Sequence, residues 1–144
     1  MRLPGEIARF KVFPDQDAPH YWTVLVFAHK GFMRRAFHRL NPMDDGDDRF
    51  AAIVMPRERR QLIRGRWRTI DPSLGYALFN RTQLCAEALC HEAVHMVFAY
   101  VRRVGQYPRL RKETDEGEED LAYCAGWCAD QLNNGFHKFH CYRK

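Results

Sequence analysis

The sequence predicts a single α+β domain over residues 1–144, in which a short mixed sheet of about three to four strands packs on two helices. Short apolar runs rich in β-branched and aromatic residues, typical of strands, precede two longer segments with the apolar spacing of helices. A chain of 144 residues encloses one core, and a hydrophobic content of 46% is that of a globular protein.

The strands are expected from apolar runs bounded by turn residues. The first lies at residues 20–28, where HYWTVLVFA contains no chain breaker. Residues 50–56 form a second strand that a proline ends, and residues 61–70 supply a third whose arginines face water. The run GYALF at 75–79 is a candidate for an edge strand of the sheet. Between the first two strands, residues 32–40 repeat apolar side chains at helical spacing and predict a short helix.

A long helix is predicted from Arg81 to Val104, where the chain contains neither glycine nor proline. Asn80 precedes it as an N-cap residue, with Gln83 three positions later. The helix is apolar on most of its circumference, so we expect it to run through the core.

A second helix is predicted from residue 118 to about 133, after a loop at 106–117. Gly135 is expected to mark its end. Ala122 and Gly126 lie along this helix and are small enough to let two helix backbones approach closely.

The long helix contains the sequence HEAVH at 91–95. Residues four apart share one face of a helix, so the imidazoles of His91 and His95 are spaced to hold a single metal ion. Glu92 points to the neighbouring side, where the glutamate of this motif acts on the water at the metal. A catalytic zinc takes three protein ligands, so a third is expected from the following helix, which Glu118 and Glu119 begin.

From Leu74 to Leu132 the chain resembles the gluzincins, and especially the minimal zincin domains of phages and prophages. The resemblance rests on GYALF, HEAVH and EEDLAYCAG, the last of which matches a pattern in which a glutamate ligand precedes an alanine by three residues. It implies a zincin-like fold and a Zn²⁺ site formed by His91, His95 and Glu119, with Glu118 as the alternative to Glu119. Tyr123 stands where many gluzincins have an aspartate that orients a histidine ligand.

The resemblance implies a zinc metallopeptidase that cleaves peptide or protein substrates. Zinc would activate a water molecule, and Glu92 would act as general base and then return the proton to the leaving amine. The GYALF strand would hold an extended peptide by backbone pairing. Tyr123, His137 and His140 are the candidates for an oxyanion donor, and the sequence does not rank them.

Other functions stay open. A zincin scaffold can serve as a non-catalytic zinc-binding structural or interaction protein of a phage. The basic patch from Arg57 to Arg68 suits nucleic acid, although a solvated strand face explains it more simply. A DNA-associated protease similar to the SprT-like group is disfavoured, because no C-x-x-C pairs occur and no histidine ligand follows His95 at the required spacing.

The expected location is the cytoplasm, which is that of the bacterial host if a phage encodes the chain. The N-terminus contains no apolar core of a secretory signal, and the longest apolar runs are far shorter than the roughly 20 residues that span a bilayer. We therefore expect no membrane partner, and the sequence does not indicate an oligomeric state.

Overall fold

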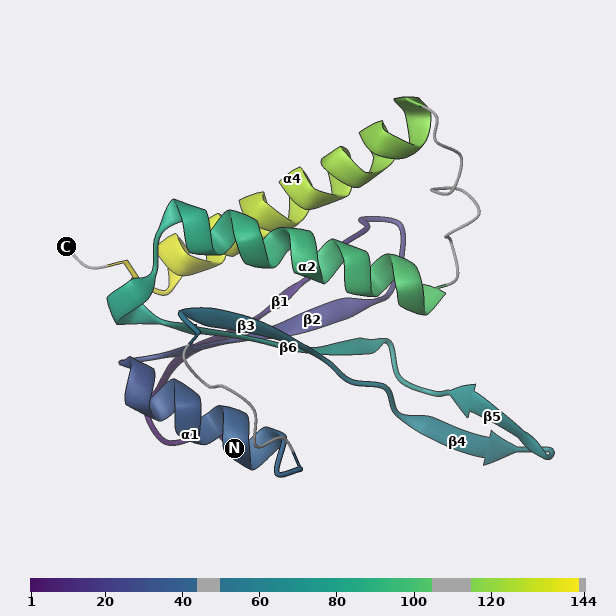
Figure 1. Ribbon diagram of the computed structural model, residues 1–144, viewed down its shortest axis with the longest axis horizontal. Coiled ribbons are helices and arrows are strands. Elements are labelled where there is room, and N and C mark those ends of the chain that lie inside the picture. The colour runs from purple at the N-terminus through teal and green to yellow at the C-terminus, as the bar shows by residue number, and fades with distance from the viewer. Residues whose placement is uncertain (44–49, 105–114, 143–144) are drawn as a thin grey trace.

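The computed structural model describes residues 1–43, 50–104 and 115–142. Within these ranges two helices lie together over one face of a four-stranded sheet, and a shorter helix covers the other face (Figure 1). Along the chain the elements are β1 (Glu6–Val12), β2 (Tyr21–Phe27), α1 (Lys30–Leu40), β3 (Ala52–Pro56), β4 (Arg60–Ile63), β5 (Arg66–Thr69), β6 (Ser73–Asn80), a 3-10 turn (Arg81–Gln83), α2 (Ala86–Val104) and α4 (Asp115–Lys138).

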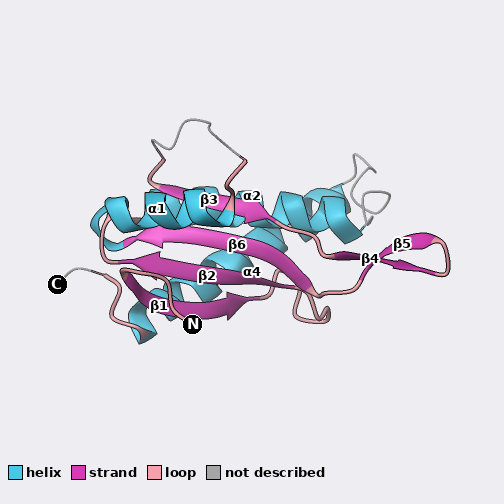
Figure 2. Cartoon of the chain, turned by 90° about the horizontal axis from the view of Figure 1, so that it is seen from below, coloured by secondary structure: helices cyan, strands magenta, loops and turns pink. Residues whose placement is uncertain are grey.

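The sheet has the strand order β1-β2-β6-β3 (Figure 2). Strands β2 and β6 are parallel, while β1 and β3 pair antiparallel with their neighbours. This arrangement confirms the expected α+β class with a small mixed sheet. No helix in the described ranges is both long enough and apolar enough to cross a membrane.

Strand β6 is central, so the prediction that GYALF forms an edge strand is wrong. It lies between β2 and β3, and six of its eight residues are buried. A continuous apolar run of this kind is typical of a strand covered on both faces. The edges are β1 and β3 instead, and Pro56 at the end of β3 suits an edge because proline cannot donate to a neighbouring strand.

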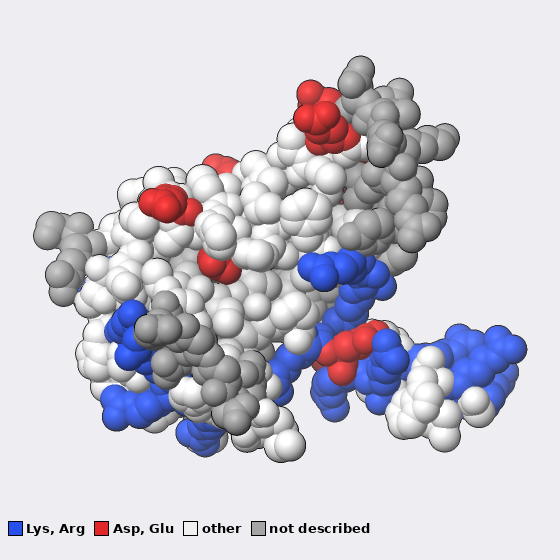
Figure 3. Space-filling view, in the orientation of Figure 1, with Lys and Arg blue, Asp and Glu red and all other residues white. Residues whose placement is uncertain are grey.

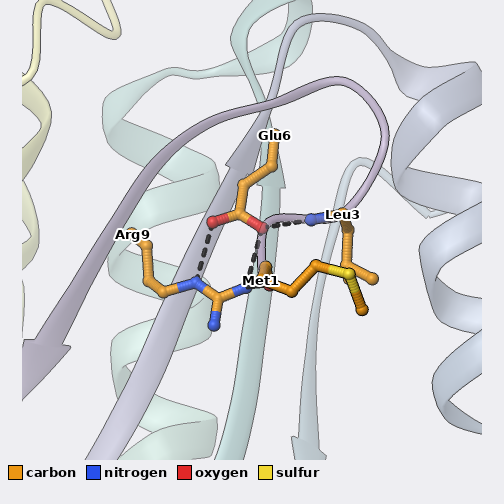
Figure 4. A network of polar contacts seen from close by, with 4 residues as sticks. All are labelled: Met1, Leu3, Glu6 and Arg9. Atoms are coloured by element: carbon orange, nitrogen blue, oxygen red, sulfur yellow. Dashed lines mark hydrogen bonds and ion pairs between the residues drawn. The ribbon is translucent and has the colours of Figure 1, made fainter.

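Strand β1 was not expected from the sequence. A bulge near its start contains the buried side chain of Glu6. The register shifts between Glu6 and Ala8, which brings Glu6 and Arg9 to one side of the strand (Figure 4). The two carboxylate oxygens of Glu6 accept hydrogen bonds of 2.8 Å from Arg9 and from the backbone N–H of Leu3. Burial acts to raise the pKa of Glu6, but these contacts outweigh it and lower the pKa.

The third predicted strand, at 61–70, is a separate hairpin. Strands β4 and β5 pair only with each other and project beyond the sheet (Figure 1). Arg64 and Gly65 connect them with positive φ angles of 50° and 74°, as a two-residue hairpin turn requires. The arginines are exposed, as the sequence indicates.

The start of the long helix differs in detail from the prediction. Asn80 caps the 3-10 turn, because its side-chain oxygen accepts the backbone N–H of Gln83 at 3.1 Å. The α-helix proper begins at Ala86. The side chain of Gln83 accepts a hydrogen bond of 3.0 Å from the amide of Asn80 rather than from its backbone N–H, so the capping pair forms side chain to side chain.

Helix α4 is longer than predicted and uses a different packing face. It continues through Gly135, whose hydrogen replaces a Cβ that would stand 2.3 Å from the ring of Phe10. Ala122 and Gly126 are exposed, so they do not form the contact between the helix backbones. The contact with the core runs instead along Leu121, Cys124, Ala125, Cys128 and Leu132.

Gly75 and Gly126 give opposite predictions for substitution by alanine. At Gly75 the φ angle is 129° and a Cβ would stand 2.1 Å from the carbonyl oxygen of Met55, so Gly75→Ala should destabilise the fold by about 2 kcal/mol or more. At Gly126, on an exposed helix face, a Cβ meets nothing within 4 Å, and Gly126→Ala should stabilise by about 0.5–1 kcal/mol. Chemical denaturation measures both, and equal effects would contradict the central placement of β6.

Candidate metal and catalytic site

Helix α2 presents its two histidines to solvent while its opposite side packs on the sheet. Leu89, Ala93 and Met96 are buried against the strands. His91 and His95 lie on the exposed side of the same turns. Their Nε2 atoms are 3.1 Å apart, and the ring planes stand at 64°. The helix therefore aims both nitrogen atoms at one point in space, as the four-residue spacing predicts.

The spacing of these nitrogen atoms suits a shared zinc ion. Zinc–nitrogen bonds of about 2.0–2.1 Å in a tetrahedron separate two nitrogen ligands by about 3.3 Å. The observed 3.1 Å between the Nε2 atoms of His91 and His95 is close to that value. The same distance also allows a hydrogen bond in which one imidazole donates to the other, so the pair alone does not distinguish a metal site from a hydrogen-bonded pair.

Glu92 lies between the histidines and the sheet, and its side chain is 7% exposed. One carboxylate oxygen is 4.0 Å from Nε2 of His91, which is too long for a direct hydrogen bond. Burial raises the pKa of Glu92, while His91 and a hydrogen bond from the backbone N–H of Val54 partly offset that rise. A buried carboxylate with a raised pKa beside two imidazoles is the kind of group that general-base catalysis uses.

Val54 belongs to β3, so Glu92 is bound to the edge of the sheet. Along a strand of an antiparallel sheet, the backbone N–H and C=O of every second residue point toward the same adjacent strand, and those of the residues between point the other way. Arg57 donates its N–H to the carbonyl of Leu74 near the start of β6. By alternation, the backbone groups of Val54 and Pro56 face away from β6. Glu92 takes the N–H of Val54, and the carbonyl of Val54 is directed outward beside it.

The structure does not bring Glu118 or Glu119 into one metal-binding group with the two histidines. No group of three histidine, cysteine, aspartate or glutamate side chains in ranges 1–43, 50–104 and 115–142 could hold a metal ion together. Glu118 and Glu119 are exposed in the first turns of α4. The residues that follow them, Asp120 and Leu121, line a cavity with Tyr100 and Val101, which lie more than a turn beyond His95 on α2.

The remaining sequence candidates lie elsewhere. Tyr123 is exposed and borders the same cavity of about 200 Å³, whose lining also includes Asp15. His137 and His140 are exposed at the end of α4 and just beyond it. The predicted loop at 106–117 falls largely outside the described residues. Sequence analysis missed the contact between Glu92 and β3, and the only signal for that edge was the proline that ends the strand.

The buried carboxylate of Glu92 makes stability depend on pH in the metal-free protein. Because the folded-state pKa lies above the ordinary value of 4.5, the ionised side chain opposes folding at pH values above the folded pKa. Below that ordinary value both folded and unfolded chains carry the neutral acid. With a chelator present, Glu92→Gln should therefore be more stable than the wild type at about pH 8 and equal to it at about pH 4.

Glu87, exposed in the first turn of α2, provides the contrast. Its charge is favourable at a helix N-terminus, so Glu87→Gln should be less stable than the wild type at pH 8 by about 0.3–1 kcal/mol. Thermal unfolding at the two pH values measures both variants. A Glu92→Gln variant that is less stable at pH 8 than at pH 4, relative to the wild type, would contradict this account of Glu92.

Comparison of the chain with protein-family models, curated proteins and solved structures finds no match. The arrangement of His91, Glu92 and His95 at the edge of the sheet is therefore the observation from which its chemistry must be argued.

Proposed function

We propose that the protein is a zinc-dependent peptidase of a zincin-like fold, in which His91 and His95 bind the metal and Glu92 is the general base. The observation that carries the proposal is the convergence of two Nε2 atoms 3.1 Å apart with a buried carboxylate 4.0 Å from His91. Burying the carboxylate of Glu92 costs free energy of folding, and two surface histidines without a metal would not explain that cost.

The proposed reaction gives separate roles to the metal, to Glu92 and to the hydrogen bond from Val54. A bound zinc ion would supply Lewis-acid activation of water and of the peptide carbonyl. Glu92 accepts a proton from the attacking water and delivers it to the leaving amine, and burial, which raises the pKa of Glu92, makes its carboxylate a stronger base than that of an exposed glutamate. The hydrogen bond from Val54 holds the carboxylate in place, with one of its oxygens 4.0 Å from Nε2 of His91.

Strand β3 replaces GYALF as the proposed peptide-binding edge. The outward carbonyl of Val54 can accept an N–H from an extended peptide that lies along β3. Val94 and Phe98 are each 43% exposed on α2, one position before and three positions after His95. These apolar side chains offer contact area for the side chains of a peptide substrate beside the metal.

A non-catalytic zinc-binding protein on the same scaffold is the second candidate. It would account for the two histidines, but it gives no role to a glutamate that the fold keeps buried and bound to a strand edge. The two functions separate experimentally, because both require metal and only one requires Glu92.

We expect about one zinc ion per purified chain, and His91→Ala and His95→Ala should each lose it. Glu92→Gln should retain the metal and lower hydrolysis of a quenched-fluorescent casein by about 10²–10⁴-fold, because the general base is removed. Glu87→Gln is the matched control on the same helix and should leave both metal and rate unchanged. Elemental analysis and the casein assay give the two readouts. Full activity in Glu92→Gln would reject the peptidase and leave the zinc-binding candidate.

Glu119 stays the proposed third ligand, with Glu118 as the alternative. Both lie in the first turns of α4, so binding by either would require that end of α4 to approach the histidines. Glu119→Gln should weaken zinc binding at least tenfold, and Glu118→Gln should do so less. Competition with a chromophoric chelator measures the affinities. Unchanged affinity in both variants would show that α4 does not supply the ligand, whatever the result with Glu92.

A further inference from the structure

The β4–β5 hairpin is an arm whose two strands pair only with each other. All eight of its strand residues are exposed, and it extends away from the sheet (Figures 1 and 2). An isolated two-stranded hairpin is at best marginally stable in water. Because the strand residues of the hairpin are exposed, packing in the core does not constrain their side chains. Contact with a partner can therefore account for their composition.

The arm concentrates most of the net positive charge of the chain. Residues 57–71 contain six arginines and two carboxylates, a net charge of +4, compared with +5 for all 144 residues. The blue surface over β4 and β5 in Figure 3 shows this concentration. Glu58 pairs with Arg60 at 2.8 Å and Asp71 with Arg59 at 3.8 Å. In the described residues no carboxylate pairs with Arg64, Arg66 or Arg68.

The two faces of the arm carry different side chains, and together they offer contacts for the phosphates and the bases of a nucleic acid. Arg66 and Arg68 share one face with Ile63, because residues directly opposite in the ladder point to the same side. The other face carries the cross-strand pair of Leu62 and Trp67, which are 56% and 67% exposed. The register places Arg60 on the same face as Trp67, and an indole so exposed can stack on an unpaired base.

The base of the arm is anchored to α2 by Arg103. Its guanidinium donates hydrogen bonds of 2.8, 2.6 and 2.7 Å to the carbonyls of Arg57, Ser73 and Asp71, so one fork ties both ends of the arm to the helix. Beside this anchor lies a cavity of about 450 Å³ whose lining includes Arg57, Arg60 and Arg102, together with Glu58, which is paired with Arg60. The basic surface therefore continues from the arm into a hollow wide enough for a phosphate group.

We propose that the β4–β5 arm binds single-stranded nucleic acid. The arginines contact phosphates, and Trp67 stacks on a base. Charge complementarity favours a polyanion over a neutral peptide, and regular spacing of arginines along a ribbon matches a repeating phosphate chain better than a single acidic side chain. The exposed indole favours unpaired bases over a duplex, whose bases are already stacked. This function is separate from the site at His91, Glu92 and His95.

The test measures binding of the full chain to a fluorescein-labelled single-stranded DNA of about 20 nucleotides by anisotropy. The variant Arg64→Ala/Arg66→Ala/Arg68→Ala should bind at least tenfold more weakly at about 0.1 M salt. Its plot of log affinity against log salt should be less steep by about 2, because each lost phosphate contact removes about 0.7 from the slope. Trp67→Ala should weaken binding about tenfold with little change of slope.

The matched control is Lys30→Ala/Arg35→Ala/Arg39→Ala on α1, which removes the same charge from the far face of the sheet. It should keep the affinity and slope of the wild type. Equal losses in the arm variant and the control would overturn the proposal, since they would show attraction to net charge alone. So would an arm variant that binds DNA normally but no longer self-associates in sedimentation, which would make the arm a contact between copies. Circular dichroism checks that each variant is folded.

Discussion

The packing of α2 on the sheet is the constraint on which the arrangement of the molecule depends. Strand β6 is buried on both faces and gives α2 a continuous apolar surface, to which Leu89, Ala93 and Met96 are fitted. Once that side of α2 is buried, its rotation about its own axis is fixed. The histidines then face solvent, and Glu92, at the boundary between the two sides, is brought against β3.

This rotation explains why a charged residue lies in a largely apolar contact. A carboxylate with 7% exposure costs free energy of folding, and one backbone hydrogen bond compensates only part of that cost. Stability alone would favour glutamine or an apolar side chain at position 92. Natural proteins keep such unfavourable groups mainly where chemistry needs them, which is the physical reason for treating this corner of the fold as a site.

The sequence predicts the parts of the fold that depend on local periodicity. The strand at 20–28, both long helices and the facing of His91 and His95 follow from spacing alone, and the structure has them. The position of GYALF in the sheet, the bulge at Glu6 and the end of α4 depend on residues distant in the chain. Gly135 shows why local patterns do not fix the end of α4. Glycine often follows the end of a helix, but here the helix continues and the missing Cβ makes room for the ring of Phe10. A third metal ligand likewise depends on how α4 approaches α2, which no local pattern encodes.

The hydrogen bonds of the Arg103 guanidinium also fix the distance between the base of the arm and the two histidines on α2. Arg103 lies eight residues after His95 on one helix, which is about 12 Å along its axis. Because the arm is tied at that point, anything held at its base is delivered at a constant offset from the pair of histidines. A protein carried on a nucleic-acid strand bound by the arm would therefore meet His91 and His95 at a raised local concentration, even if its own contacts with the chain were weak.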